Sequence, residues 1–222
     1  MRKDMKHDFW HQKWEKNEIG FHLPDANTLL VQHFSTLNLK PESNPKISPR
    51  IFLPLCGKTL DIAWLLAQGY RIAGAELSSI AIEGLFKSLN LMPTIKTLGE
   101  VTHYSAPNID IFVGDIFKVS PNMLGVVDAV YDRAALVALP EDIRKLYTAH
   151  LITLANHAPQ LLICFEYDQS LHAGPPFSIK VDEVKQHYQA SYDLNLLGST
   201  AVAGGLKGVC PATEHVWWLK PL

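Results

Sequence analysis

The chain has 222 residues, of which 47% are hydrophobic and 19% are charged, and its formal net charge is -2. These are globular values, and a chain of this length buries roughly 70% or more of the surface that it exposes when unfolded. The weak net charge and the lack of a basic stripe argue against nucleic acid or an acidic membrane as a partner. We expect a single domain, residues 1–222.

Cysteine usage points to a reducing compartment. The three cysteines, Cys56, Cys164 and Cys210, lie far apart and form no CxxC pair, which argues against a disulfide framework and a zinc site. The N-terminal residues contain no apolar signal core, and no apolar run approaches the roughly 18 residues that a membrane span needs. We expect a soluble, cytoplasmic monomer without a metal.

The chain begins with an arm, residues 1–49, that precedes the core at residues 50–222. Trp10 and Trp14 are four residues apart and would share one face of a helix. That helix either packs against the body of the protein through its tryptophans or forms a lid over a pocket. A second helix is expected across Asn27–Leu37, and a linker rich in Pro, Ser and Asn follows it.

The core begins with Arg50–Asp61 (RIFLPLCGKTLD), where an apolar run to Leu55 predicts a short buried strand. Gly57 breaks that run, and Thr59 or Asp61 can open a helix that ends at Gly69. A second strand, Ile72–Leu77, ends on the acidic residue Glu76, which lies 19 residues after Gly57. Nucleotide-binding units place there the carboxylate that accepts the ribose hydroxyls.

The glycines of this unit limit which class of ligand it can bind. A phosphate-binding P-loop would need a glycine at Phe52, and the dinucleotide fingerprint G-x-G-x-x-G is missing. A single glycine in the turn suits a ligand that brings a ribose but no pyrophosphate, and S-adenosylmethionine is such a ligand. The alternative is an ordinary βαβ unit in which Glu76 stands by chance.

Strands alternate with helices along the rest of the core. Residues 93–108 are loop-like, with room for a short edge hairpin. The predicted strands are Ile109–Val113, Val126–Asp132, the apolar Gln160–Tyr167, and a closing pair at Tyr192–Leu197 and Glu214–Leu219. The predicted helices are Ser78–Asn90, Pro140–Asn156 and Val181–Ala190. This order predicts an α/β fold, a mostly parallel seven-stranded sheet flanked by helices.

Polar residues follow several of these strands, and parallel strands place such residues at one edge of the sheet. Asp115 could accept from an exocyclic amine of adenine, with Ile116 against the ring. Arg133 follows its strand directly, so its guanidinium is expected in the cleft, where it can bind a carboxylate or steady an anionic acceptor. The alternative is an ion pair with Asp132 or Asp115.

Motifs for other chemistry are missing. The sequence contains no H-E-x-x-H, no G-x-S-x-G and no pair of histidines at metal-ligand spacing. Methyl transfer from a sulfonium needs neither a metal nor an activated nucleophile, because alignment of acceptor and methyl supplies much of the rate. We therefore expect Arg133 to place the reactants, with no dedicated base.

Five segments together resemble the thiopurine S-methyltransferase family in its bacterial form: FWHQKWEKNEIGFH, FLPLCGK, GAELS, YDRAALVALP and YDQSLHAGPPF. The resemblance runs from Phe9 to Leu219. It implies a Rossmann-like class I methyltransferase that uses S-adenosylmethionine, with an N-terminal covering segment. The cofactor-contacting positions that it implies are Trp14, Leu55, Glu76, Arg133 and the adenine-side pair Asp115 and Ile116. It further implies that Phe21 lies beside the acceptor.

One departure concerns the acceptor. Family members often carry an arginine near the last loop, whereas the loop AVAGGLKGVCPATEH has Lys207 as its only cation. We expect Lys207 to be a weak acceptor contact, because lysine lacks the planar fork of arginine. A thiopurine-like thiol or thione is the expected acceptor, and selenium or tellurium species are further candidates. The alternatives are methylation of halide or thiocyanate ions, a nicotinamide-dependent oxidoreductase, and a binding protein without turnover.

Overall fold

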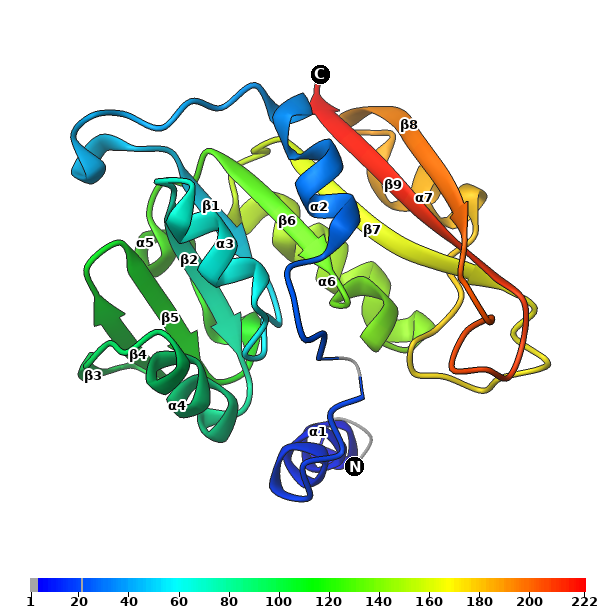
Figure 1. Ribbon diagram of the computed structural model, residues 1–222, viewed down its shortest axis with the longest axis horizontal. Coiled ribbons are helices and arrows are strands. Elements are labelled where there is room, and N and C mark those ends of the chain that lie inside the picture. The colour runs from blue at the N-terminus through cyan, green and yellow to red at the C-terminus, as the bar shows by residue number, and fades with distance from the viewer. Residues whose placement is uncertain (1–3, 21) are drawn as a thin grey trace.

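The computed structural model describes residues 4–20 and 22–222. These residues form one nine-stranded sheet with helices on both faces (Figure 1). The strand order is β3-β4-β5-β2-β1-β6-β7-β9-β8. The strands are β1 (Arg50–Leu53), β2 (Arg71–Glu76), β3 (Thr94–Leu98), β4 (Val101–Ala106), β5 (Ile109–Val113), β6 (Ala129–Arg133), β7 (Gln160–Tyr167), β8 (Tyr192–Ala201) and β9 (Ala212–Pro221).

Helices precede β1 and connect most of the parallel strands. The α-helices are α1 (Asp4–Glu15), α2 (Thr28–His33), α3 (Asp61–Ala67), α4 (Ser79–Ser88), α5 (Pro121–Leu124), α6 (Glu141–Leu154) and α7 (Val181–Tyr188). Short 3-10 turns are η1 (Phe34–Leu37), η2 (Pro45–Ile47), η3 (Ile116–Lys118) and η4 (Leu136–Ala138). In Figure 1, α2 and α3 lie in front of the sheet and α6 lies behind it.

The α/β fold with a mostly parallel central sheet is confirmed, but the count of seven strands is wrong. Strands β5, β2, β1, β6 and β7 pair in parallel. The two additional strands are β3 and β4, an antiparallel hairpin added at the β5 edge. They fall in residues 93–108, the segment expected to be loop-like with a possible edge hairpin, because most side chains of β3 face solvent and give no apolar signal. The closing antiparallel pair, β8 and β9, is confirmed and longer than expected.

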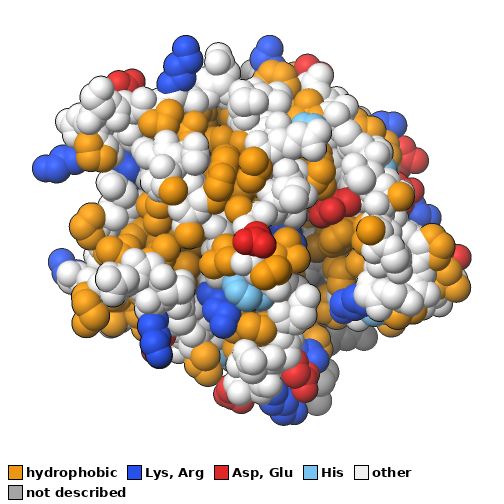
Figure 2. All heavy atoms as spheres, viewed as in Figure 1, with side chains coloured by type: hydrophobic (Ala, Val, Ile, Leu, Met, Phe, Trp, Pro, Cys, Tyr) orange, Lys and Arg blue, Asp and Glu red, His pale blue; other side chains and the backbone are white. Residues whose placement is uncertain are grey.

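Two apolar clusters hold the helices to the sheet, one on each face. Residues alternate between the faces along each strand, so Phe52 of β1 joins the cluster that contains Tyr147 of α6, whereas Ile51 joins the cluster that contains Leu30 of α2. Both faces of the central strands are therefore buried, as their continuous apolar runs indicate. The face shown in Figure 2 carries both acidic and basic side chains among apolar ones.

Asp61 has a different role from the helix cap that was predicted. Helix α3 begins at Asp61 with Leu60 as its N-cap residue, and the Asp61 carboxylate is buried. It accepts a hydrogen bond from the Asn27 N–H, at 2.7 Å, and from the Tyr131 hydroxyl, at 3.1 Å. Asp61 thereby joins the start of α2 to β6. The Asn27 side chain caps α2.

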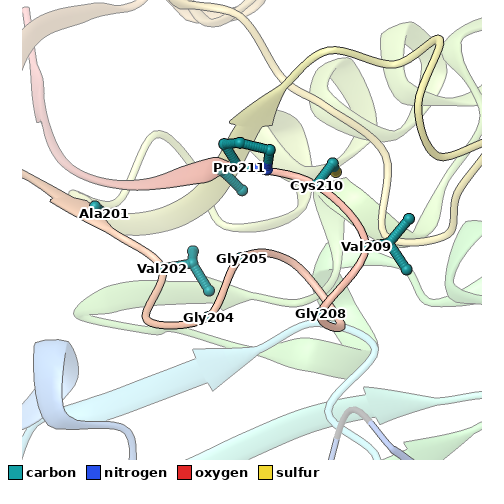
Figure 3. A pocket seen from close by; sticks show the side chains of 9 residues that line it. Ala201, Val202, Gly204, Gly205, Gly208, Val209, Cys210 and Pro211 are labelled. Atoms are coloured by element: carbon teal, nitrogen blue, oxygen red, sulfur yellow. The ribbon is translucent and has the colours of Figure 1, made fainter.

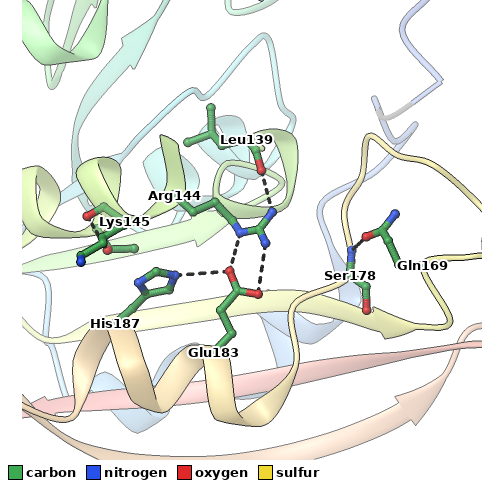
Figure 4. A network of polar contacts seen from close by, with 8 residues as sticks. Leu139, Arg144, Lys145, Gln169, Ser178, Glu183 and His187 are labelled. Atoms are coloured by element: carbon green, nitrogen blue, oxygen red, sulfur yellow. Dashed lines mark hydrogen bonds and ion pairs between the residues drawn. The ribbon is translucent and has the colours of Figure 1, made fainter. Parts of the chain in front are cut away.

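A buried ion pair joins α6 to α7 behind the sheet (Figure 4). The Arg144 guanidinium donates to both carboxylate oxygens of Glu183 and to the Leu139 carbonyl, which lies between η4 and α6. His187 contacts the same carboxylate. Because Leu139 lies six residues after Arg133 in sequence, this pair fixes the segment that follows β6.

Candidate functional site

The turn after β1 has an unusual backbone. Leu55 and Gly57 have φ angles of 46° and 54°, in the left-handed region that costs a leucine conformational energy. The Cys56 N–H donates to the Ala75 carbonyl, which holds the turn against β2. The strand predicted to run through Leu55 is wrong in this detail, because β1 ends at Leu53 and Leu55 lies in the turn. The structure places the half-buried Leu55 side chain against the apolar cluster of α6.

Glu76 ends β2 and lies against this turn. Its Oε2 accepts from the Gly57 N–H at 2.8 Å, and its Oε1 accepts from the Ser78 N–H at 2.9 Å. Burial raises the pKa of Glu76, and the N–H donors oppose that rise. A carboxylate oxygen has more than one acceptor direction. Glu76 can therefore keep both backbone contacts and still accept from two hydroxyls of a ribose.

Trp14 of α1 covers the same turn. A Cβ atom added to Gly57 would lie 3.0 Å from Cζ2 of the buried Trp14 indole. The Lys58 ammonium lies 6.0 Å from the centre of a Trp14 ring. Helix α1 lies on the side of the sheet toward which the central strands point (Figure 1). The indole of Trp14 is both buried and close to Gly57.

Asp115 and Ile116 follow β5, next to Glu76. The Gly114 N–H donates to the Glu76 carbonyl at 2.8 Å, which brings the end of β5 to the end of β2. Asp115 Oδ1 accepts from the Phe117 N–H at 3.0 Å and so caps η3. Ile116 is buried, and its carbonyl oxygen lies 2.9 Å from Nε2 of His150.

Arg133 ends β6 and is half-buried. The alternative of an ion pair with Asp132 or Asp115 does not hold, because no carboxylate of residues 8–20 and 22–222 forms a salt bridge with Arg133. Asp132 instead accepts from the Tyr147 hydroxyl at 2.7 Å and the Leu136 N–H at 3.1 Å. Burial raises the pKa of Asp132 to about 6.

Two further titratable groups lie within the electrostatic reach of Arg133. Burial lowers the pKa of His22, and the positive charges of Lys58 and Arg133 lower it further. Burial raises the pKa of Glu214 on β9, and the charge of Arg133 opposes this rise. Neither His22 nor Glu214 was singled out from the sequence, although His22 is the last residue of the segment FWHQKWEKNEIGFH. The available signal was an acid at the start of the apolar run EHVWWL.

The acceptor-side predictions are Phe21 and Lys207. Phe21 lies outside the described residues. The Lys207 ammonium donates to the Pro175 carbonyl at 2.8 Å, and burial together with the charge of Lys13 lowers the pKa of Lys207. Lys207 therefore ties the loop between β8 and β9 to the proline-rich segment His172–Ser178.

The loop that carries Lys207 folds back on itself, with Gly204 and Gly208 at its bends (Figure 3). It borders an open pocket of about 330 Å³ lined by residues 201–202, 204–205 and 208–212. A second cavity, of about 600 Å³, is lined by residues 121–122, 125–128, 154–156 and 158–159. None of the predicted site residues lines either cavity, so the candidate site is defined by the turn after β1 and the strand ends beside it.

In the described part of the chain, no three His, Cys, Asp or Glu residues are grouped so that they could hold a metal ion. None of the helices within residues 4–20 and 22–222 is long and apolar enough to cross a bilayer.

Comparison with known proteins identifies close relatives. The model of the family described as thiopurine S-methyltransferase (TPMT) matches residues 5–219. A thiopurine S-methyltransferase from Xanthobacter autotrophicus is 54% identical over 217 residues, which are 97% of this chain and 99% of the relative. A relative of the same name from Gluconobacter oxydans is 48% identical over 214 residues, which are 96% of this chain and 94% of the relative.

Solved structures share the fold at low sequence identity. The 1,6-didemethyltoxoflavin-N1-methyltransferase of Burkholderia thailandensis, solved with S-adenosylhomocysteine, aligns with a TM-score of 0.64 at 13% identity, covering 97% of this chain and 87% of that one. A SAM-dependent methyltransferase from Anabaena variabilis aligns with a TM-score of 0.60 at 19% identity, covering 96% of this chain and 95% of that one.

Proposed function

Because the chain belongs to the thiopurine S-methyltransferase family, and is therefore an S-adenosylmethionine-dependent methyltransferase, we propose that it methylates the sulfur of heteroaromatic thiols and thiones, thiopurines among them. The observation that carries this proposal is the single-glycine turn at Gly57, closed by the Glu76 carboxylate and covered by the Trp14 indole. That arrangement suits a ribose and leaves no second glycine for a pyrophosphate.

The residues around the turn fit S-adenosylmethionine. The spare acceptor directions of Glu76 receive the ribose hydroxyls, and Asp115 accepts from the adenine amine while it keeps its contact with the Phe117 N–H. Trp14 and Leu55 enclose the middle of the ligand. Arg133, which has no salt bridge within the described chain, is available to the carboxylate of the methionine end or to an anionic acceptor.

S-adenosylmethionine, when bound, supplies an electrophilic methyl group on a sulfonium. The protein's contribution is alignment, because an in-line displacement is accelerated chiefly by holding the two sulfur atoms and the methyl carbon in register. The buried indole of Trp14 also excludes water from the turn. Where the acceptor sulfur is ionised, exclusion of water strengthens its attraction to the sulfonium.

Binding and turnover are tested separately. Isothermal titration with S-adenosylmethionine is expected to release heat, and an absence of heat at millimolar ligand would refute the proposed site. A screen of thiols, thiones, selenium and tellurium species and iodide, each with labelled cofactor, then identifies the acceptor. We expect methylated thiopurine. Methyl iodide as the dominant product would favour the halide alternative, for which Lys207 offers the only cation of the late loop.

We further propose that the protein works as a cytoplasmic monomer on a small-molecule acceptor. The modest net charge of -2 and the mixed signs on the surface in Figure 2 support a small ligand over a polyanion. Sedimentation at micromolar concentration tests the monomer. A mass near twice 24.8 kDa would refute it.

A further inference from the structure

Two opposite charges lie on one face of the sheet, on either side of β7. Arg133 of β6 pairs with Ile163 of β7, and Glu214 of β9 pairs with Phe165 of the same strand. Tyr131 and Val216, each two residues from one of these charges, belong to one apolar cluster. Side chains two apart on a strand share a face, so Arg133 and Glu214 project from the same side.

The backbone separation of the two residues is of the size that two side chains and a small ligand between them would span. The two residues are two strands apart, at about 4.8 Å per strand, and are offset by two residues, or about 7 Å, along the strand direction. No hydrogen bond or salt bridge of either side chain occurs within residues 8–20 and 22–222, although the charge of Arg133 acts on Glu214. Both side chains are half-buried rather than sealed in the core.

We propose that Glu214 binds the acceptor through a ring N–H next to the thione and accepts its proton as the sulfur is methylated. This inference rests on the proposed function. It narrows the acceptor class to cyclic thioamides, in which an N–H group lies next to C=S. It also departs from the expectation of no dedicated base, because it gives that role to Glu214.

The step balances. A lone pair of the thione sulfur forms the new S–CH3 bond, and the pair of the old sulfonium bond stays on the departing thioether sulfur. The N–H pair becomes a ring C=N bond as C=S becomes C–S, and the proton moves to the Glu214 carboxylate, which later releases it to water. Burial raises the pKa of Glu214, so its carboxylate is a better proton acceptor than an exposed glutamate.

Glu166 provides a matched control. It lies on β7, next to the residue that pairs with Glu214, so its side chain projects from the opposite face. Its carboxylate contacts Nε2 of His215 at 3.2 Å, and Nδ1 of His215 contacts the Ser199 hydroxyl at 2.8 Å. Glu166 is therefore a partly buried strand glutamate that already has a partner and does not face Arg133.

The experiment compares Glu214→Gln and Glu166→Gln with the wild-type enzyme. The first readout is kcat/KM with 6-mercaptopurine, which has an N–H beside its thione, and with thiophenol, which has no ring nitrogen. The second readout is binding of 6-mercaptopurine to the complex with S-adenosylhomocysteine, followed by tryptophan fluorescence. Titration with S-adenosylmethionine and a thermal melt check that both variants are folded.

We expect Glu214→Gln to lower kcat/KM for 6-mercaptopurine about tenfold or more, within the range of a general base, and to weaken its binding. The variant should keep cofactor affinity and change the thiophenol rate less than threefold. Glu166→Gln should change both rates less than threefold. An unchanged 6-mercaptopurine rate in Glu214→Gln, or an equal loss with thiophenol, would overturn the role of Glu214. A wild-type enzyme that methylates neither acceptor would instead refute the proposed function.

Discussion

The Gly57 N–H and the Glu76 carboxylate form a hydrogen bond of 2.8 Å between residues that are 19 apart in sequence. The bond joins the turn after β1 to the end of β2, and it orients one carboxylate oxygen before any ligand arrives. The second oxygen is held by the Ser78 N–H. Preorganisation of this kind lowers the cost of binding, because the carboxylate does not have to be ordered by the ligand.

Glu76→Ala is predicted to weaken S-adenosylmethionine binding at least tenfold while it changes the acceptor KM less than threefold. The variant loses hydrogen bonds to a charged group, each of which contributes about 1.5–3 kcal/mol. Isothermal titration and steady-state kinetics measure the two effects. Glu83→Ala, an exposed position on α4, is the control. Equal changes in cofactor affinity and acceptor KM would count against a ribose-binding role.

Gly57→Ala is predicted to lower both stability and cofactor affinity. Its φ of +54° is strained for alanine, at about 1–2 kcal/mol, and the new Cβ would lie 3.0 Å from the Trp14 indole. Gly204→Ala is the control for backbone strain alone. Its φ is +73°, but nothing lies within 4 Å of its Cβ position. Urea unfolding and cofactor titration should show a loss of affinity in Gly57→Ala alone. The same affinity in both variants would mean that the indole does not cover the ligand.

The parts of this site that follow from local pattern could be predicted from the sequence. Glu76 was identified because a strand, a glycine turn, a helix and a second strand fix where its carboxylate must lie. The strands β5 and β7 were predicted with their observed bounds, since mostly apolar runs between turn-forming residues mark strands. Convergence of Asp115 and Arg133 at the same edge followed from the parallel order of the strands.

Features that depend on distant partners could not be read from the sequence. Asp61 has the pattern of a helix cap, yet it bonds Asn27 and Tyr131, which are 34 and 70 residues away. The positive φ of Leu55 belongs to a turn that the Ala75 carbonyl holds in place. Glu214 was missed for the same reason, because its relation to Arg133 arises only when β9 pairs with β7.

The ion pair between α6 and α7 is predicted to stabilise the fold. Arg144 and Glu183 are largely buried, and removal of one partner leaves an uncompensated buried charge, at a cost of about 3–5 kcal/mol. Glu183→Gln should therefore lower the free energy of unfolding by several times more than Asp182→Asn, because the Asp182–Lys185 pair is exposed and of the kind that contributes about 1 kcal/mol or less. Urea unfolding of both variants measures this difference. Equal losses would show that Arg144 finds another partner.

Asp132 is predicted to make stability depend on pH between about 4 and 6. Burial raises the pKa of Asp132 from 3.8 to about 6 in the folded state, so the folded chain binds a proton there more tightly than the unfolded chain does. The free energy of unfolding therefore falls as the pH rises through this window, by up to about 3 kcal/mol, and this contribution is constant at higher pH.

Asp132→Asn tests that prediction. The amide cannot ionise, while its oxygen can still accept from the Leu136 N–H. Urea unfolding at several pH values should show a smaller decline in stability from pH of about 4 to about 6 in the variant than in the wild type. Asp193→Asn, at an exposed position of β8, should keep the wild-type slope. Because the same burial acts on Glu76 and Glu214 in the same direction, the informative quantity is the difference between the two slopes. If Asp132→Asn kept the full wild-type decline in stability with pH, a group other than Asp132 would be responsible for it.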